Sequence, residues 1–160
     1  ACQKEESGFI PNGQDEDFFT STIFGVVYDT ADAPLENATI SFNGTSTVTD
    51  ANGVYKLSDV SVSSFHNSLL IRKDGYFEGS RTFRTISATT INQVTKLYPK
   101  IFDSSFDAQS GGVVSKDNTT VEFSSNSIVV EASNTTYTGK VNVAIENNVK
   151  NTSVFYCILI

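Results

Sequence analysis

Residues 47–57 constrain the fold more than any other part of the chain, because they join two alternating runs through a tight polar turn. Asn-Gly between such runs is the strongest short-range signal for a β-hairpin. Gly53 accepts a positive φ without steric cost, and Asn52 tolerates one better than most residues. The sequence therefore predicts a β-hairpin whose structural turn contains Asp50, Asn52 and Gly53.

The composition narrows the class of protein. The 160 residues carry a formal charge of −7 with a pI near 4.5, which argues against nucleic acid and anionic membrane surfaces as partners. No apolar run approaches the roughly 18 residues that a transmembrane helix needs. Apolar and polar residues alternate from residue 20 onward, so we expect an all-β chain.

The sequence divides into three parts. Residues 1–18 predict a tether, since glycine, proline and an acidic run break any periodicity and bury nothing. Residues 19–99 predict a β-sandwich domain with about seven short strands separated by regular turn signals, the pattern of a Greek key. Residues 100–160 predict a second small β domain.

The first two residues suggest a lipid anchor. Ala1-Cys2 resembles the end of a bacterial lipobox, and residues 3–7 resemble the acidic signal that sends some Gram-negative lipoproteins to the outer surface. The resemblance implies a lipid on Cys2, attachment to the membrane through it, and exposure on the surface of the bacterial outer membrane. A mature lipoprotein begins at its cysteine, so Ala1 departs from the pattern. A disulfide between Cys2 and Cys157, or an acidic tail with a chance cysteine, remains open.

Four motifs in the predicted sandwich occur in an order that is typical of one family. Segment 25–29 reads GVVYD, 33–40 reads APLENATI, 49–55 reads TDANGVY and 73–76 reads KDGY. Together they resemble the carboxypeptidase regulatory-like domain. The resemblance implies a transthyretin-like sandwich that accompanies other domains in secreted and outer-membrane proteins. That family supplies no catalytic residues of its own.

The second β domain is similar to the opening of ZU5-like modules, through GGVV at 111–114, VEF at 121–123 and YTGKVNV at 137–143. The alternative is an unrelated small sandwich. Its last segment, 154–160, is apolar at both alternating sets of positions, so a strand there requires cover on both faces. An exposed strand edge invites pairing with another chain. We therefore expect a further part of the chain or a protein partner to lie against this strand.

Catalysis and metal binding find little support. The single histidine, His66, lies in a loop of serines and asparagine, and a zinc site needs three or four ligands. A Ser-His-Asp site would need His66 as its base, and no GxSxG motif occurs. Asp50 and Gly53 lack the spacing of a calcium loop. The sequence predicts no enzyme, no cofactor and no metal.

Two functions remain. The first is a non-enzymatic cell-surface lipoprotein that acts as a spacer, an adhesin or an accessory subunit of an outer-membrane complex. The alternative is a carbohydrate-binding module of a surface system for glycan use. Its glycan platform would consist of the aromatic residues Tyr76, Phe77 and Tyr98, which also suit packing at strand ends.

Overall fold

The computed structural model describes residues 16–102, 104–148 and 152–159, and all regular elements in these ranges are β-strands. No helix there is long and apolar enough to cross a membrane. The prediction of an all-β chain is therefore confirmed. The strands are β1 (Phe18–Tyr28), β2 (Thr39–Phe42), β3 (Thr45–Val48), β4 (Val54–Ser63), β5 (Asn67–Arg72), β6 (Gly79–Phe83), β7 (Thr90–Lys96), β8 (Ser104–Asp107), β9 (Gly112–Lys116), β10 (Thr119–Phe123), β11 (Val129–Val130), β12 (Thr135–Thr136), β13 (Lys140–Asn148) and β14 (Thr152–Leu159).

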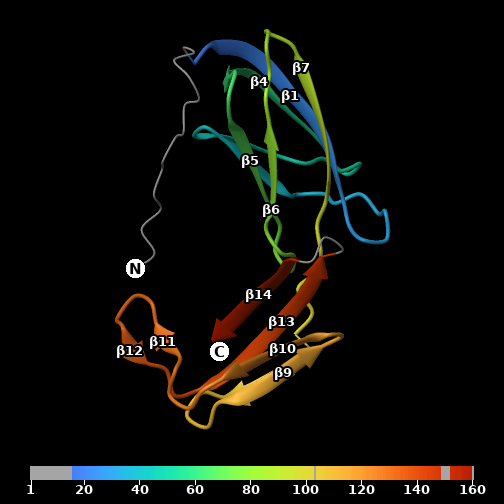
Figure 1. The fold of residues 1–160 in the computed structure, drawn as a ribbon. Coiled ribbons are helices and arrows are strands. Elements are labelled where there is room, and N and C mark those ends of the chain that lie inside the picture. Colours follow the sequence, from blue (N-terminus) through green and yellow to red (C-terminus); the bar gives the residue numbers. More distant parts are fainter. Residues whose placement is uncertain (1–15, 103, 149–151, 160) are drawn as a thin grey trace.

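The first seven strands form a sandwich of two sheets (Figure 1). One sheet has the order β4-β1-β7, in which β1 pairs antiparallel with β4 and parallel with β7. The other has the order β3-β2-β5-β6, and its pairs are all antiparallel. The predicted sandwich of seven strands, followed by further β-structure, is confirmed.

The core of this sandwich lies between the two sheets. β1 alternates inward and outward residues, and its Ile23 and Val27 are fully buried. From the facing sheet Phe42 packs inward, and its ring stacks on Phe83 with centroids 5.9 Å apart. Each large apolar side chain buried in this way contributes about 1.5–3 kcal/mol relative to exposure. The other buried apolar residues of this core are Leu35, Ala38, Ile40, Tyr55, Leu57, Val60, Val62, Leu69, Ile71 and Leu97.

Residues 50–53 form a tight turn. The Gly53 amide donates to the Asp50 carbonyl at 2.9 Å, and Gly53 has a φ of 72°. The Asp50 carboxylate accepts from the amides of Asn52 and Val54, each at 2.9 Å. The predicted hairpin was nevertheless wrong, because β3 and β4 belong to different sheets.

The chain crosses from one sheet to the other at this turn. Before the turn, the Thr49 amide donates to the Ala38 carbonyl and so continues the pairing of β2 with β3. On the other side, the Val27 amide donates to the Gly53 carbonyl at 2.9 Å, and β4 continues along β1. Asn-Gly specifies the local reversal, whereas pairing depends on which neighbour lets a strand bury its apolar face. β4 achieves this beside β1, where Tyr55 and Leu57 are buried.

The sandwich begins inside the predicted tether. β1 starts at Phe18, and the backbone of Asp17 is already held: its carbonyl accepts from the Ser64 amide at 2.8 Å. The Glu16 carboxylate accepts a hydrogen bond from the Ser63 hydroxyl. The remainder of the predicted tether, including Cys2 with its predicted lipid, lies outside the described residues.

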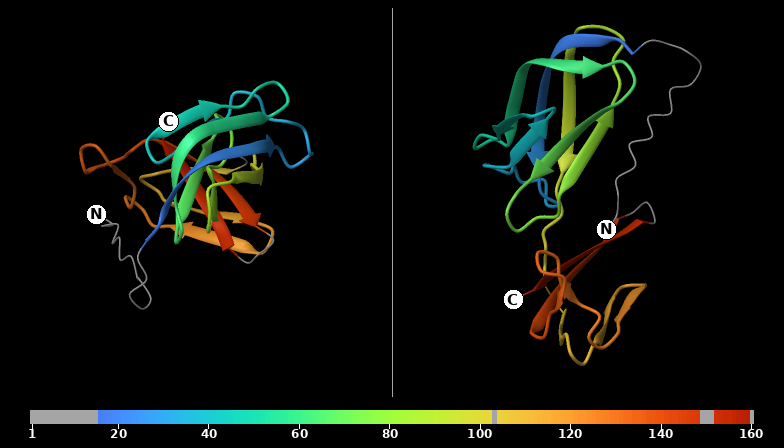
Figure 2. Two further views of the ribbon diagram at one scale, coloured as in Figure 1. Left: turned by 90° about the horizontal axis from the view of Figure 1, so that it is seen from above. Right: turned by 90° about the vertical axis from the view of Figure 1, so that its left-hand side faces the viewer.

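The strands after β7 build a second group with its own core. β13 lies between β14 and β8, and β9 pairs with β10. Figure 1 and the right-hand view of Figure 2 show this group beyond one end of the first sandwich. The rings of Phe106 and Phe123 stack with centroids 4.7 Å apart. The buried apolar residues of this second core are Ala108, Val114, Val141, Val143 and Ile145.

β14 pairs with β13 over its whole length, from Thr152 opposite Asn148 to Leu159 opposite Val141. It is an edge strand of its sheet. The predicted alternation and burial of the side chains at 154–160 lie outside the described part of the structure.

Candidate functional site

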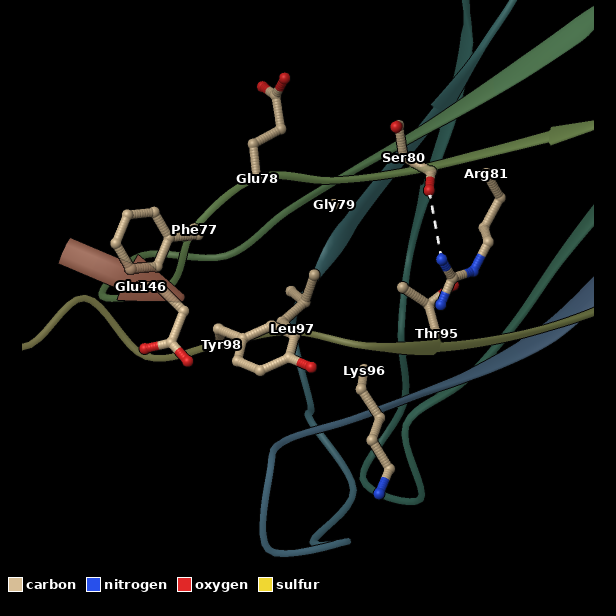
Figure 3. A pocket seen from close by; sticks show the side chains of 10 residues that line it. All are labelled: Phe77, Glu78, Gly79, Ser80, Arg81, Thr95, Lys96, Leu97, Tyr98 and Glu146. Carbon is tan, nitrogen blue, oxygen red and sulfur yellow. Dashed lines mark hydrogen bonds between the residues drawn. The ribbon is translucent and has the colours of Figure 1, made fainter. Parts of the chain in front are cut away.

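A hollow of the first sandwich lies where β6 and β7 form the edges of the two sheets. At one end the edges are joined by the Phe77 amide, which donates to the Tyr98 carbonyl at 2.8 Å. At the other end Arg81 Nε reaches across to the Val94 carbonyl at 3.2 Å. Between these two closures lies a pocket of about 540 Å³, here called the seam pocket (Figure 3). It is lined by Phe77, Glu78, Gly79, Ser80, Arg81, Thr95, Lys96, Leu97, Tyr98 and Glu146.

Three of the four charged side chains that line the seam pocket are neutralised by residues outside it. Glu78 pairs with Arg72, Lys96 Nζ lies 2.6 Å from Asp32, and Glu146 lies 3.4 Å from Lys116 Nζ. The hydrogen bond to Asp32 raises the pKa of Lys96. Arg81 is the fourth charged side chain of the pocket, and no carboxylate among the described residues forms an ion pair with it.

Arg81 is held by backbone oxygens alone. Its Nε donates to Val94 and its Nη1 to Ser80. A guanidinium has five N–H donors in a fixed fork. Two of them are therefore occupied, and the side chain is only half-buried, so the others remain available to a ligand.

Two buried hydroxyls near this cation have no hydrogen-bond partner in the described part of the chain, those of Thr95 and Tyr55. Thr95 is 1% exposed and lines the seam pocket, and Tyr55 is 2% exposed on β4, which β1 separates from β7 in the same sheet. The Tyr55 ring lies over Gly25, where a Cβ would come within 2.5 Å of the phenol oxygen. A buried hydroxyl without a hydrogen-bond partner costs about 1–3 kcal/mol of stability. A polar atom that formed a hydrogen bond with either hydroxyl would recover part of this cost.

Burial raises the pKa of Tyr55 to about 12, and the nearby charge of Arg81 lowers it in part. Below pH 10 the phenol is neutral in the folded and the unfolded protein. Between pH 10 and 12 the unfolded phenol ionises first, so the contribution of Tyr55 to stability falls as the pH rises.

We expect Tyr55→Phe to leave stability at pH 7 unchanged or slightly higher, because the hydroxyl has no described partner and its removal leaves none unpaired. The variant should also lose less stability than the parent on going from pH 7 to pH 11. Urea unfolding at both pH values measures the difference. Equal losses in parent and variant would contradict the raised pKa.

The three predicted platform aromatics do not share one exposed surface. Phe77 is 5% exposed, and its ring borders the seam pocket together with Tyr98. Tyr76 instead lines a separate hollow of about 370 Å³ with Lys100 and Phe102. Tyr76 and Phe77 both precede β6: Tyr76 forms an isolated bridge with Pro99, and Phe77 lies between this bridge and the strand.

The remaining sequence candidates lie elsewhere. Asp50, Asn52 and Gly53 form the turn between β3 and β4 and do not line the seam pocket. His66 is exposed in the loop between β4 and β5. Among the described residues no group of three His, Cys, Asp or Glu side chains could hold a metal ion.

Sequence reasoning missed the polar residues of the seam pocket, although one signal was present. In β7 the inward positions read Ile91, Gln93, Thr95 and, just beyond the strand, Leu97. Gln93 and Thr95 are polar although they occupy inward positions. Buried polar side chains need hydrogen-bond partners, so this pattern indicates a polar site at the edge of the core. Arg81 occupies an equivalent inward position on β6, between Gly79 and Phe83.

Comparisons with known proteins leave the family open. No family model matches the chain, and no curated protein matches it. A cohesin–X-dockerin complex from Acetivibrio cellulolyticus is 21% identical with a TM-score of 0.41, over 50% of this chain and 58% of that one. The 3-chlorocatechol 1,2-dioxygenase from Rhodococcus opacus is 13% identical with a TM-score of 0.39, over 55% and 62%. A provisionally named carbohydrate binding protein from Bacteroides uniformis is 11% identical with a TM-score of 0.38, over 79% and 51%.

The chain thus spans less than two thirds of the length of each of these three solved chains. All three TM-scores are below 0.5, so these similarities carry no inference about ligand, partner or reaction.

Proposed function

We propose that this chain is a non-enzymatic accessory protein of the bacterial cell surface, which binds a protein partner along β14. The observation that carries the proposal is the position of β14 at the edge of its sheet, in the order β14-β13-β8. The segment reads TSVFYCIL and is apolar at both alternating sets of positions. A strand of that composition is stable only when both faces are covered and its free edge is paired or protected.

The described residues supply little for catalysis. The single histidine is exposed in a loop, and the charged side chains of the seam pocket are mostly engaged in ion pairs. A general base or nucleophile needs a partner within hydrogen-bond reach to be activated. A binding role requires no such constellation, which favours an accessory function.

The proposed location on the cell surface rests on the sequence. The Ala1-Cys2 pair and the acidic residues after it support a lipid on Cys2 and exposure on the outer membrane. In this proposal residues 19–99 are a carboxypeptidase regulatory-like, transthyretin-like module, and the following strands are a ZU5-like module that presents β14. The two modules then hold the partner clear of the membrane.

Site-specific photo-crosslinking in the native host tests the proposal. A benzoylphenylalanine at position 156, in the middle of β14, should crosslink one protein species. The same probe at position 56, on the exposed face of β4, should not. Cys2→Ser should release the chain from the membrane fraction, because the lipid is its proposed anchor.

Each arm of this experiment has an outcome that counts against the proposal. No crosslink at position 156, or the same species at both positions, would contradict a partner at β14. A Cys2→Ser chain that stays in the membrane fraction would contradict the lipid anchor.

The carbohydrate-binding alternative loses its aromatic platform, since Phe77 is buried and Tyr76 lines a different hollow. If the chain binds a sugar, the polar seam pocket suits it better than a flat aromatic surface.

A further inference from the structure

The seam pocket has the dimensions and chemistry of a small-molecule site. Its volume of about 540 Å³ falls within the roughly 300–1,000 Å³ that such sites occupy. Its long sides are formed by residues of β6 and β7 and of the segments next to them, and both strands lie at the edges of their sheets. The two closures, Phe77 to Tyr98 and Arg81 to Val94, fix its length.

The two ends of the pocket differ in charge. Figure 3 shows Arg81 at one end and Glu146 at the other, with Tyr98 on the Glu146 side. Arg81 offers N–H donors that no described carboxylate uses. Such donors form their strongest hydrogen bonds with a carboxylate.

The protein as a whole repels anions, since its formal charge is −7. Attraction of an anion to this pocket therefore depends on local donors and not on a general positive field. Thr95 adds a second local reason, because this residue lines the pocket and its buried hydroxyl has no partner among the described residues. A polar ligand atom that reached this hydroxyl would satisfy it.

The other end of the lining suits sugar hydroxyls. Tyr98 contributes a hydroxyl group there, and the carboxylate of Glu146 can accept hydrogen bonds. Tyr98 also lines the pocket with an aromatic ring, a group that can pack against a sugar ring. One ligand carrying a carboxylate at one end and several hydroxyls at the other would match both ends at once.

We propose that the seam pocket binds an acidic sugar, with its carboxylate on Arg81 and its hydroxyls toward Tyr98 and Glu146. This site is separate from β14, and the proposal holds whether or not β14 has a protein partner.

The test uses the ¹⁵N-labelled full chain and three probes: sodium glucuronate, glucose and N-acetylaspartate. Glucose has the ring and hydroxyls without the carboxylate, and N-acetylaspartate has carboxylates without the ring. Glucuronate should shift amide resonances of residues 77–81 and 95–98. The two other probes should bind at least about tenfold more weakly, since each lacks half of the matching groups.

Two variants locate the contacts, and a third serves as the control. Arg81→Gln should weaken glucuronate binding about tenfold or more, because a charge-assisted hydrogen bond is lost. Arg84→Gln removes an exposed arginine three residues further on, which does not line the pocket, and should leave the affinity unchanged. Thr95→Val keeps the shape of the side chain and should weaken binding several-fold while the protein remains folded.

The measurements also define failure. Absence of shifts with glucuronate, or shifts confined to other residues, would overturn the site. Equal affinity for glucose or for N-acetylaspartate would overturn the acidic-sugar class, the latter in favour of an acidic peptide. Unchanged binding by Arg81→Gln would overturn the role of the guanidinium. The crosslinking experiment on β14 is unaffected by any of these outcomes, so the two proposals fail separately.

Discussion

Gly53→Val is expected to lower the free energy of unfolding by about 3 kcal/mol and to damage the fold more than any exposed substitution. Gly53 has a φ of 72°, and a β-branched residue held at positive φ costs about 1–3 kcal/mol. A Cβ at this position would also lie 2.4 Å from the Val27 carbonyl oxygen. That contact forces β1 or the turn to shift, at a further cost of about 1–3 kcal/mol. Urea unfolding of parent and variant measures the loss.

Gly44 offers a matched control. It has a φ of 80°, yet a Cβ there would have no heavy atom within 4 Å. Gly44→Val therefore carries the backbone strain without the steric contact and should destabilise the protein clearly less than Gly53→Val. Equal losses of stability in the two variants would mean that the structure adjusts to the contact between the new side chain and β1 without a cost in free energy. An unchanged melting curve for Gly53→Val would show that Gly53 does not hold this conformation.

The turn at Gly53 shows what sequence reasoning reaches and where it stops. Asp-Ala-Asn-Gly predicted a chain reversal, because the residues that permit one act within four positions of each other. The partner of β4 could not be predicted in the same way, since pairing depends on surfaces contributed by residues far away in the chain, such as Val27, which precedes Gly53 by 26 positions. In place of the expected hairpin, the chain crosses at this turn from one sheet to the other.

Strand ends show the same limit. The strand β6 begins at Gly79 and ends at Phe83, and the apolar residue Ile86, three positions further on, is 92% exposed. Alternation along a strand predicts which residues are buried only while the strand continues. Here the chain leaves the sheet before Ile86, and the apolar character of this residue alone does not reveal where the strand ends.

The seam pocket lay beyond sequence reasoning for a further reason. Arg81 and Thr95 are 14 positions apart, and their two strands belong to different sheets. Only the stacking of those sheets makes them line one space. Each residue alone reads as an ordinary strand residue, with polar side chains commonly facing solvent. Alternation and turn signals therefore predicted the sandwich, whereas the site depended on the order of strands within it.

Val143→Asp is expected to unfold the second group of strands and to leave the first sandwich intact. Val143 is 1% exposed at the centre of β13, which pairs with β14 on one side and β8 on the other. A carboxylate there would lose its hydration without an ion-pair partner, so the loss should exceed about 4 kcal/mol. The buried residues of the first core are a separate cluster. Amide hydrogen exchange, read separately for residues 18–97 and 104–148, measures both.

Asn142→Asp is the matched control, since it introduces the same carboxylate on the neighbouring residue, whose side chain is partly exposed. It should change exchange little in either part. Because β14 is held by β13 over its whole length, Val143→Asp should also abolish the proposed crosslink from position 156, while Asn142→Asp retains it. Loss of protection in residues 18–97 would show that the two cores unfold as one unit. Crosslinking that persists after the second core has unfolded would show that the partner recognises the sequence of residues 152–159 as a linear segment and does not need the strand.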